Sequence, residues 1–545
     1  MAPLAPLAWQ VALAAALALP PLPPGMDRAE AAVTEDGLRA DIRFLADDLL
    51  EGRGPGGRGD ALARRWIASQ LEAMGYKPGG PGGSWEQPFE MVGVTASPPA
   101  EWRFTTPGGS HVLRTLEEFV AFAGRPAEET RLSDAELVFV GYGIQAPEFG
   151  WDDYKGMDLK GKVLVMLNDE PDADPALFAG SRRLYYGRWD YKLESAARQQ
   201  AAGVLLVHTR RSAGYGWNVV RTSWTGEQFE LPDTPGPRLE VAGWISEQAA
   251  AALARLAGRE LPALQQAAKD RRFRPVPLGI RTSLALRSTV RRVTTANVLG
   301  LLPGSDPTLR DEVVVFTAHH DHLGAGAPDA SGDTIYNGAL DNAAGVAQML
   351  AVARAFASLP VPPRRSVLML AVAAEECGLL GSGWFARHPT FPAEKISADV
   401  NFDGGNIWGR TSEVPLIGYG KSSLDAFARA AAARQGRTVT DEPFPDRGFF
   451  YRSDQFSFAR IGVPSLYFDT ATSFLGRPPG WGKERIEAYE SERYHQPGDE
   501  LVETWVFDGM VEDARFAFVA GLLVAQADVP PAWAPGDEFE RQRRR

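Results

Sequence analysis

Apolar residues are spaced differently in different parts of the chain. Between residues 36 and 77 they recur every three or four positions, which is typical of amphipathic helices. The first of these helices has an apolar face made of Leu38, Ile42, Leu45 and Leu49. Residues 86–124 and 130–285 carry short apolar runs bounded by Gly, Asp and aromatic residues, so we expect mainly strands there.

From Thr294 onward the pattern alternates between short buried strands and helices. The spacing predicts strands over 296–302, 312–318, 366–373, 398–403 and 463–468. It predicts helices over 341–358, 378–387, 422–435 and 507–526. This alternation indicates an α/β domain with a mixed, mainly parallel sheet flanked by helices.

A glycine-rich stretch, Glu51–Gly59, separates the two helices predicted between 36 and 77. It lacks the spacing and the Lys-Ser/Thr ending of a phosphate-binding loop. We therefore expect a shaped loop between two helices.

Length and charge narrow the possible functions. A chain of 545 residues argues for at least two domains. The net charge of -12 disfavours nucleic acid or an anionic membrane as the main partner. Cys377 is the single cysteine, so no intrachain disulfide can form.

The first 32 residues predict a signal peptide. Residues 4–22 are rich in Ala and Leu, and Ala29-Glu30-Ala31 offers a cleavage site. No Lys or Arg precedes this stretch, so an uncleaved anchor and a start at Met26 are the alternatives. Because Pro20–Pro24 would end a helix early, we expect an exported protein, periplasmic or secreted, without a stable membrane span.

Three of the seven histidines lie in one loop after the strand predicted at 312–318. The apolar run ends in His319, His320, Asp321 and His322. In open α/β sheets, ligands bind beyond the carboxyl ends of the strands, which is where this loop would lie. For this motif alone, a polar loop whose histidines satisfy backbone groups is an equal alternative.

Four more polar motifs lie at the edges of predicted elements. They are Asp341-Asn342 before a helix, Glu375-Glu376 after a strand, Asp403-Gly-Gly after another strand, and Tyr494-His495 in a polar loop. Each has a simpler explanation, since Asp341-Asn342 could cap its helix and the others could be a solvated strand end or a turn. Five such motifs within one α/β region favour a shared metal site.

The residue types favour zinc. His319 and His495 supply nitrogen, and the carboxylates Asp341, Glu376 and Asp403 supply oxygen. This mixture suits catalytic zinc with open coordination positions. One bridging carboxylate would give each of two ions one histidine and two carboxylates, with the ions about 3.5–4 Å apart.

The paired glutamates and Asp321 fit supporting roles in such a centre. Neighbouring side chains at a strand end diverge, so one glutamate can bind metal while the other faces the bound water as general base. The metals would lower the pKa of that water from about 15.7 towards roughly 7. Asp321 is placed two residues from His319, where it can hold the other ring nitrogen.

These residues resemble the di-zinc peptidase family that includes bacterial leucyl aminopeptidases and glutamate carboxypeptidase. The resemblance rests on AHHDHLG (318–324), GALDNAAG (338–345), AAEECGLLGS (373–382), NFDGG (401–405) and RYHQPGDE (493–500). It is strengthened by RSDQFSFARIGVPSLYF (452–468) and by the EGRGPGG motif in Glu51–Gly59. The resemblance implies the zinc exopeptidase fold.

The resemblance also implies the role of each site residue. One zinc would bind His319, Asp341 and Asp403, and the other Asp341, Glu376 and His495; Co²⁺ or Mn²⁺ could replace zinc. Glu375 would be the catalytic acid and base, and Tyr494 would stabilise the oxyanion. Gln455 departs from the family, where histidine is frequent, which puts local substrate contacts in doubt.

The resemblance further implies a domain order. Residues 33–129 and 286–530 would form the peptidase domain, 130–285 an inserted, mostly β protease-associated domain, and 531–545 a tail. Relatives with this insert use it beside the substrate cleft without supplying ligands. Within the insert, His208 stands alone, as structural histidines do.

The resemblance implies that the substrates are peptides, and we expect an aminopeptidase first of all. A glutamate-type carboxypeptidase is the first alternative, with Arg447, Arg452 or Arg460 as possible holders of a terminal carboxylate. A glutaminyl cyclase and a non-catalytic binding protein rank lower, because the full ligand set and the base are present. The sequence leaves side-chain preference and oligomeric state open.

Overall fold

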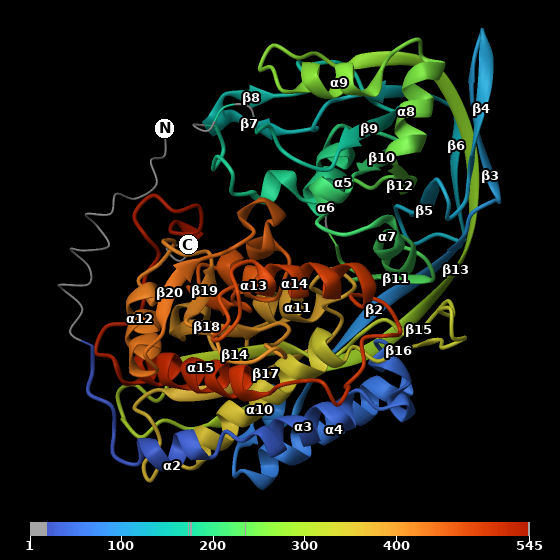
Figure 1. Ribbon diagram of the computed structural model, residues 1–545. Helices are drawn as coiled ribbons and strands as arrows, with labels where there is room; N and C mark the ends of the chain where they lie inside the picture. Colours follow the sequence, from blue (N-terminus) through green and yellow to red (C-terminus); the bar gives the residue numbers. More distant parts are fainter. Residues whose placement is uncertain (1–18, 173, 175–176, 235, 543–545) are drawn as a thin grey trace. The chain divides into compact units, whose positions relative to one another are not determined.

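Four parallel strands form the centre of one sheet in the computed structural model of the protein (Figure 1). Their order is β17 (Ser366–Val372), β14 (Val313–His319), β18 (Ile396–Phe402) and β21 (Ser465–Phe468). Antiparallel neighbours are the end of β13 (Val276–Leu302) beside β17, and β19 (Glu413–Ile417) beside β21. β1 (Lys77–Pro78) pairs with β13, and β20 (Thr438–Asp441) with β19. The sheet is mixed and mainly parallel, which confirms the predicted fold class.

The structure describes residues 19–172, 174, 177–234 and 236–542, which fall into two units. The larger unit comprises the described residues up to Phe89, then Thr294–Pro443, and those from Arg452 onward. The smaller unit comprises Glu90–Val293 together with Phe444–Tyr451. The smaller unit thus begins at residue 90 and its long segment ends at 293, whereas the predicted insert spans 130–285.

In the larger unit, alternate residues of the central strands face two separate apolar clusters. Val314 and Phe316 of β14 pack with one group of helices, and Val313 and Val315 face the opposite way. The first group is α2 (Met26–Ala31), α3 (Glu35–Leu45), α4 (Arg58–Ala73), α10 (Ala344–Ala357), α12 (Leu424–Arg434) and α15 (Asp508–Gln526). The second cluster includes residues of α11 (Leu380–Arg387) and α13 (Gln455–Arg460). One further helix of this unit, α14 (Trp481–Glu492), follows later in the chain. This alternation is what a sheet buried between helices requires.

The helices predicted between residues 36 and 77 form, with one difference. Thr34 caps α3 by accepting a hydrogen bond from the Gly37 N–H, and α3 ends at Leu45. Leu49 therefore lies outside that helix, in the short 3₁₀ segment η1 (Asp48–Arg53), and its side chain is 72% exposed. Its assignment to the apolar face was wrong because the helix ends one turn earlier than the pattern suggested.

The predicted signal peptide lies partly outside the described residues, which begin at residue 19. The predicted cleavage site Ala29-Glu30-Ala31 is part of α2, where Met26 and Ala29 are buried in the first apolar cluster. Within the described part of the chain, none of the helices combines the length and the hydropathy needed to cross a bilayer.

Parallel strands also form the centre of the smaller unit. β10 (Gly203–His208) lies between β9 (Val163–Leu167) and β12 (Val241–Ser246), and β6 (Glu129–Phe139) continues the sheet beside β9. Residues 90–129 belong here because β5 (Phe119–Ala123) pairs with β12 and β3 (Glu101–Thr106) pairs with β13. The other helices and strands are β2 (Glu86–Ser97), β4 (Gly109–Arg114), β7 (Gln145–Ala146), β8 (Trp151–Asp152), β11 (Glu227–Glu230), α5 (Trp189–Arg198), α6 (Arg210–Ala213), α7 (Trp217–Ser223), α8 (Glu247–Leu256) and α9 (Leu261–Ala268).

Candidate metal centre

Neighbouring parallel strands bring the predicted ligand loops to one edge of the larger unit's sheet. In the register of the sheet, His319 lies opposite Val372, and Ala318 lies opposite Phe402. The chain therefore leaves β14, β17 and β18 at the same level. Asp403 follows β18 directly, and Glu375 and Glu376 follow β17 after two residues.

The loop before α10 supplies Asp341. Its backbone is fixed by Asp499, whose carboxylate accepts hydrogen bonds from the N–H groups of Leu340 and Asp341 at 3.0–3.2 Å. The neighbouring Asn342 side chain accepts a hydrogen bond from the Gly345 N–H at 2.9 Å, as a helix cap does. The capping explanation therefore holds for Asn342, while the Asp341 carboxylate faces the histidines.

Asp341 lies between two histidines, with one oxygen close to each. Its Oδ1 is 3.3 Å from Nε2 of His319, and its Oδ2 is 3.2 Å from Nε2 of His495. Asp403 Oδ1 is 3.5 Å from His319 Nε2, and Glu376 Oε2 is 3.1 Å from His495 Nε2. The five predicted ligands thus form two triads that share Asp341.

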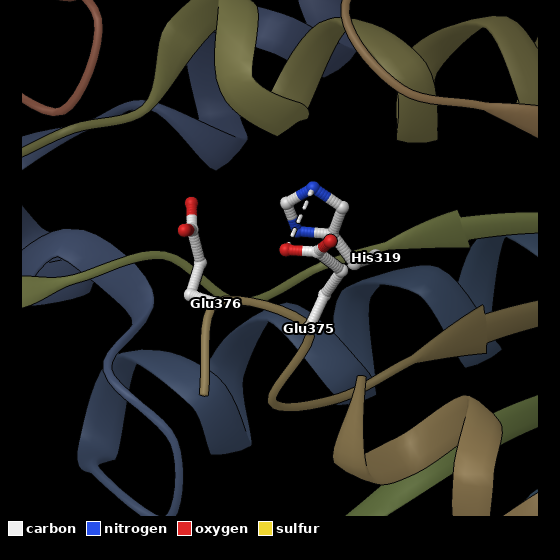
Figure 2. A group of neighbouring side chains, drawn as sticks. All are labelled: His319, Glu375 and Glu376. Carbon is white, nitrogen blue, oxygen red and sulfur yellow. Dashed lines mark ion pairs between the residues drawn. The ribbon is translucent and has the colours of Figure 1, made fainter. Parts of the chain in front are cut away.

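The side chains of Glu375 and Glu376 point in different directions, as expected, but they leave the backbone at a turn and not at the end of a strand. β17 ends at Val372, and Ala374 has a φ of +56°, so the pair does not continue the strand as predicted. Figure 2 shows the Glu375 carboxylate beside the His319 ring, with Glu376 rising separately from the next backbone position. Glu375 Oε2 lies 4.0 Å from His319 Nε2. Burial, together with Glu376 and Asp403 nearby, raises the pKa of Glu375 well above its ordinary value.

The charges of the site fit a bound cation. Burial alone would lower the pKa of His495, but Glu376 and Asp341 raise it to about 10. The pKa of His319 is likewise raised against the effect of burial, by Glu375, Asp341 and Asp403. Among the described residues, His319 Nε2 and Glu376 Oε1 are buried without a hydrogen bond. A buried cluster that favours positive charge this strongly, and whose possible metal-ligand atoms lack hydrogen bonds, has the chemistry of a metal site.

Asp321 holds the glutamate turn more directly than it holds His319. Its carboxylate accepts hydrogen bonds from the N–H groups of Glu375 at 3.1 Å and Glu376 at 3.3 Å. His319 Nδ1 is 3.3 Å from the backbone oxygen of Asp321 and 3.7 Å from its carboxylate. The predicted contact with the ring is therefore made chiefly by the Asp321 backbone, and the carboxylate orients the paired glutamates.

Tyr494 is placed beside the centre. Its ring stacks on that of His495 with centroids 3.9 Å apart, and its hydroxyl is 3.4 Å from a guanidinium nitrogen of Arg452. Burial raises the pKa of Tyr494 well above its ordinary value, so the hydroxyl remains a proton donor.

Three further residues considered from the sequence make packing or hydrogen-bond contacts in the structure. Gln455 is fully buried, and its Oε1 accepts a hydrogen bond from the Asn401 amide at 2.9 Å, so it supports β18 instead of a substrate contact. Of the arginines considered for a carboxylate, Arg447 packs over the Phe444 ring at 3.8 Å and Arg460 over the Phe456 ring at 5.7 Å.

Arg53, in the glycine-rich loop, was missed by sequence reasoning. It is 1% exposed and donates hydrogen bonds to the backbone oxygens of His320 at 2.8 Å, Asn337 at 2.6 Å and Gly338 at 2.9 Å. One buried cation therefore joins the loop of His319 to the loop of Asp341. The EGRG motif was the available signal, but it gives no indication of what the arginine contacts.

The fold and the two triads together define a metal-dependent hydrolase with its centre at the carboxyl edge of an α/β sheet. Residues 297–507, a little under two fifths of the chain, match the family model of peptidase family M28, which is in line with the resemblance of the motifs.

Two curated proteins are similar in sequence to parts of the chain. Aminopeptidase YwaD of Bacillus subtilis (strain 168) is 26% identical over 240 residues, which cover 43% of this chain and 49% of that protein. The probable leucine aminopeptidase 2 of Aspergillus oryzae is 25% identical over 308 residues, 55% of each chain. The chain thus spans about half the length of these relatives.

The aminopeptidase from Aneurinibacillus sp. strain AM-1 shares the fold. Its structure aligns with a TM-score of 0.53 and 20% identity, over 93% of this chain and 97% of that chain.

Proposed function

We propose that the protein is an aminopeptidase that uses two zinc ions to hydrolyse the first peptide bond of its substrates. The observation that carries the proposal is Asp341, whose two oxygens lie 3.3 Å and 3.2 Å from the Nε2 atoms of two different histidines. The matching relatives named aminopeptidases support the choice of reaction. Co²⁺ or Mn²⁺ in place of zinc remains compatible with the same donor set.

The residues divide the chemistry between them. One ion would be held by His319, Asp341 and Asp403, and the other by Asp341, Glu376 and His495; bound zinc would acidify water and polarise the peptide carbonyl. Glu375, whose carboxylate lies 4.0 Å from His319 Nε2, accepts the proton of the attacking water and passes it to the leaving amine. Tyr494 donates a hydrogen bond to the carbonyl oxygen as that oxygen gains negative charge.

Two further points belong to the same proposal. The motif VFVGYGIQAPEF and the strands around it support a protease-associated domain for the smaller unit. The Ala/Leu-rich N-terminal sequence supports export to the periplasm or the medium, where peptides would be the substrates.

Hydrolysis of one short peptide in three forms tests the proposal. The forms carry a free N-terminus, an acetylated N-terminus or an amidated C-terminus, and each is assayed with and without a chelator. We expect chelator-sensitive cleavage that is lost only on acetylation. Loss only on amidation would make the protein a carboxypeptidase, the alternative in which Arg452, whose guanidinium lies 3.4 Å from the Tyr494 hydroxyl, would hold the terminal carboxylate. Metal binding without any cleavage would contradict both.

A further inference from the structure

His322 is a fully buried histidine that the five-ligand scheme leaves unused. It lies in the same loop as His319, and within the described part of the chain neither of its ring nitrogens makes a well-aligned hydrogen bond. The ring packs closely on Gly338, where an added Cβ would come within 2.5 Å of the His322 ring. A buried imidazole fixed in this way needs a polar partner.

The nearest carboxylate to His322 is that of Glu376, and its two oxygens face different imidazoles. Glu376 Oε2 is 3.1 Å from His495 Nε2, whereas Oε1 is 2.8 Å from His322 Nδ1. The N–H direction of Nδ1 is not aligned with Oε1 in the structure, so the hydrogen bond needs a small shift of one of the two side chains. We propose that His322 is a positioning residue that holds Glu376 Oε1 by a hydrogen bond and so leaves Oε2 for the ion shared with His495. The inference rests on the proposed two-ion function.

Direct binding is the alternative that the distances weigh against, because His322, Asp341 and Glu376 each offer a possible ligand atom within 4.8 Å of the others. The nitrogens of His319 and His495 lie 3.1–3.5 Å from the carboxylate oxygens of their triads, which is the spacing of atoms that share one ion. The separation of 2.8 Å between His322 and Glu376 is instead that of a direct hydrogen bond.

The two triads also differ in burial, which explains why one of them needs this support. The Glu376 side chain is 5% exposed, so its second oxygen depends on a protein donor. The Asp403 side chain is 22% exposed, so water can reach it. His322 should therefore control the affinity of the ion on the His495 side and leave the ion on the His319 side unchanged.

Zinc titration of the full-length protein tests the inference. Metal-free wild type, His322→Ala, His322→Asn and His320→Ala are titrated with Zn²⁺ against a chromophoric chelator, and circular dichroism checks that each is folded. His322→Asn keeps an amide nitrogen near the place of Nδ1. His320→Ala removes another fully buried imidazole of the same loop, one whose Nε2 contacts Asp60 at 2.9 Å and no predicted ligand.

We expect two zinc ions in the wild type and a loss of about 10–100-fold in the affinity of only one of them in His322→Ala. His322→Asn should recover most of that affinity, and His320→Ala should leave both ions close to wild type. Unchanged affinities in His322→Ala, or equal weakening of both ions, would overturn the inference. The ligand set is checked by the absorption spectrum of the Co²⁺-loaded proteins. If His322→Ala shows the loss of an imidazole ligand and His322→Asn does not restore the wild-type spectrum, His322 binds the metal directly, and the inference is overturned. A wild type that binds fewer than two ions would reject the two-ion function itself, which is a distinguishable result.

Discussion

Both units bury several carboxylates, but they neutralise them in different ways. In the smaller unit, the fully buried Lys192 donates hydrogen bonds to the backbone oxygens of Tyr142 and Asp169, and Arg183 lies 3.1 Å from the Asp169 carboxylate. In the larger unit, the carboxylates of the two triads face imidazoles, which can release a proton and bind a metal ion through the freed nitrogen. A buried charge cluster that already contains its own cations is structural, whereas one that ends in imidazole nitrogens is suited to a metal.

The two units also place their histidines in opposite surroundings. His495, among carboxylates, has its pKa raised to about 10 against the effect of burial. His208, at the end of β10, has its pKa lowered to about 4 by burial, although its contact with the Tyr215 backbone oxygen opposes the shift. The His208 ring packs against aromatic side chains, including Trp217 and Trp244. Two buried histidines of one chain thus differ because of the charges beside them.

The largest effect is expected from the paired glutamates of the metal centre. Glu375→Gln should lower kcat by about 10²–10⁴-fold while zinc content stays at the wild-type value, because the general base is lost and the triads are intact. Glu376→Gln is the matched variant one residue away, and it should lose zinc together with activity. Metal analysis and peptide assays on both proteins provide the measurement. Wild-type turnover in Glu375→Gln would remove its assignment as the base.

A smaller effect, on stability, is expected from the charged residues around the buried Lys192 of the smaller unit, which include Arg183 and Asp169. Lys192→Met should lower the free energy of unfolding by about 3–5 kcal/mol, since it leaves buried oxygens and carboxylates without their cation. Zinc content should not change. Urea unfolding followed by tryptophan fluorescence measures the loss, and the exposed Lys160→Met is the control. A Lys192→Met protein as stable as the control would show that the cluster does not depend on its cation.

The smallest effect is expected from acidification around His208. The unfolded chain takes up a proton near the ordinary pKa of 6.5, but the folded state does so only near 4. The stability that neutral His208 contributes is therefore complete above pH 6.5 and is lost as the pH falls towards 4, by at most about 3 kcal/mol. Urea unfolding of wild type and His208→Phe at several pH values in this range gives the difference. Parallel pH profiles for the two proteins would contradict the assignment.

The sequence was sufficient to predict that the five candidate ligands lie together, because three of the five polar motifs follow the ends of strands that the apolar pattern already indicates and the family resemblance supplies the other two. Parallel pairing then brings His319 and Asp403 together without further information. The pattern could not reveal the partners of Arg53 or Asp499, since both act on backbone atoms of loops distant in the chain. It also missed the membership of residues 90–129, because β5 and β3 are defined by pairing with strands more than 100 residues away.

Arg53 has one more consequence, which concerns the protein without its ions. The guanidinium fixes the backbone of both ligand loops through hydrogen bonds that involve no metal. The hydrogen bonds that hold the loops in place therefore form when the protein folds, before zinc binds. Chelation should then leave a folded protein without metal, in which both ligand loops keep their positions. Zinc should rebind to this protein at a rate set by ion diffusion and dehydration. Loss of zinc should therefore be reversible and should not unfold the protein.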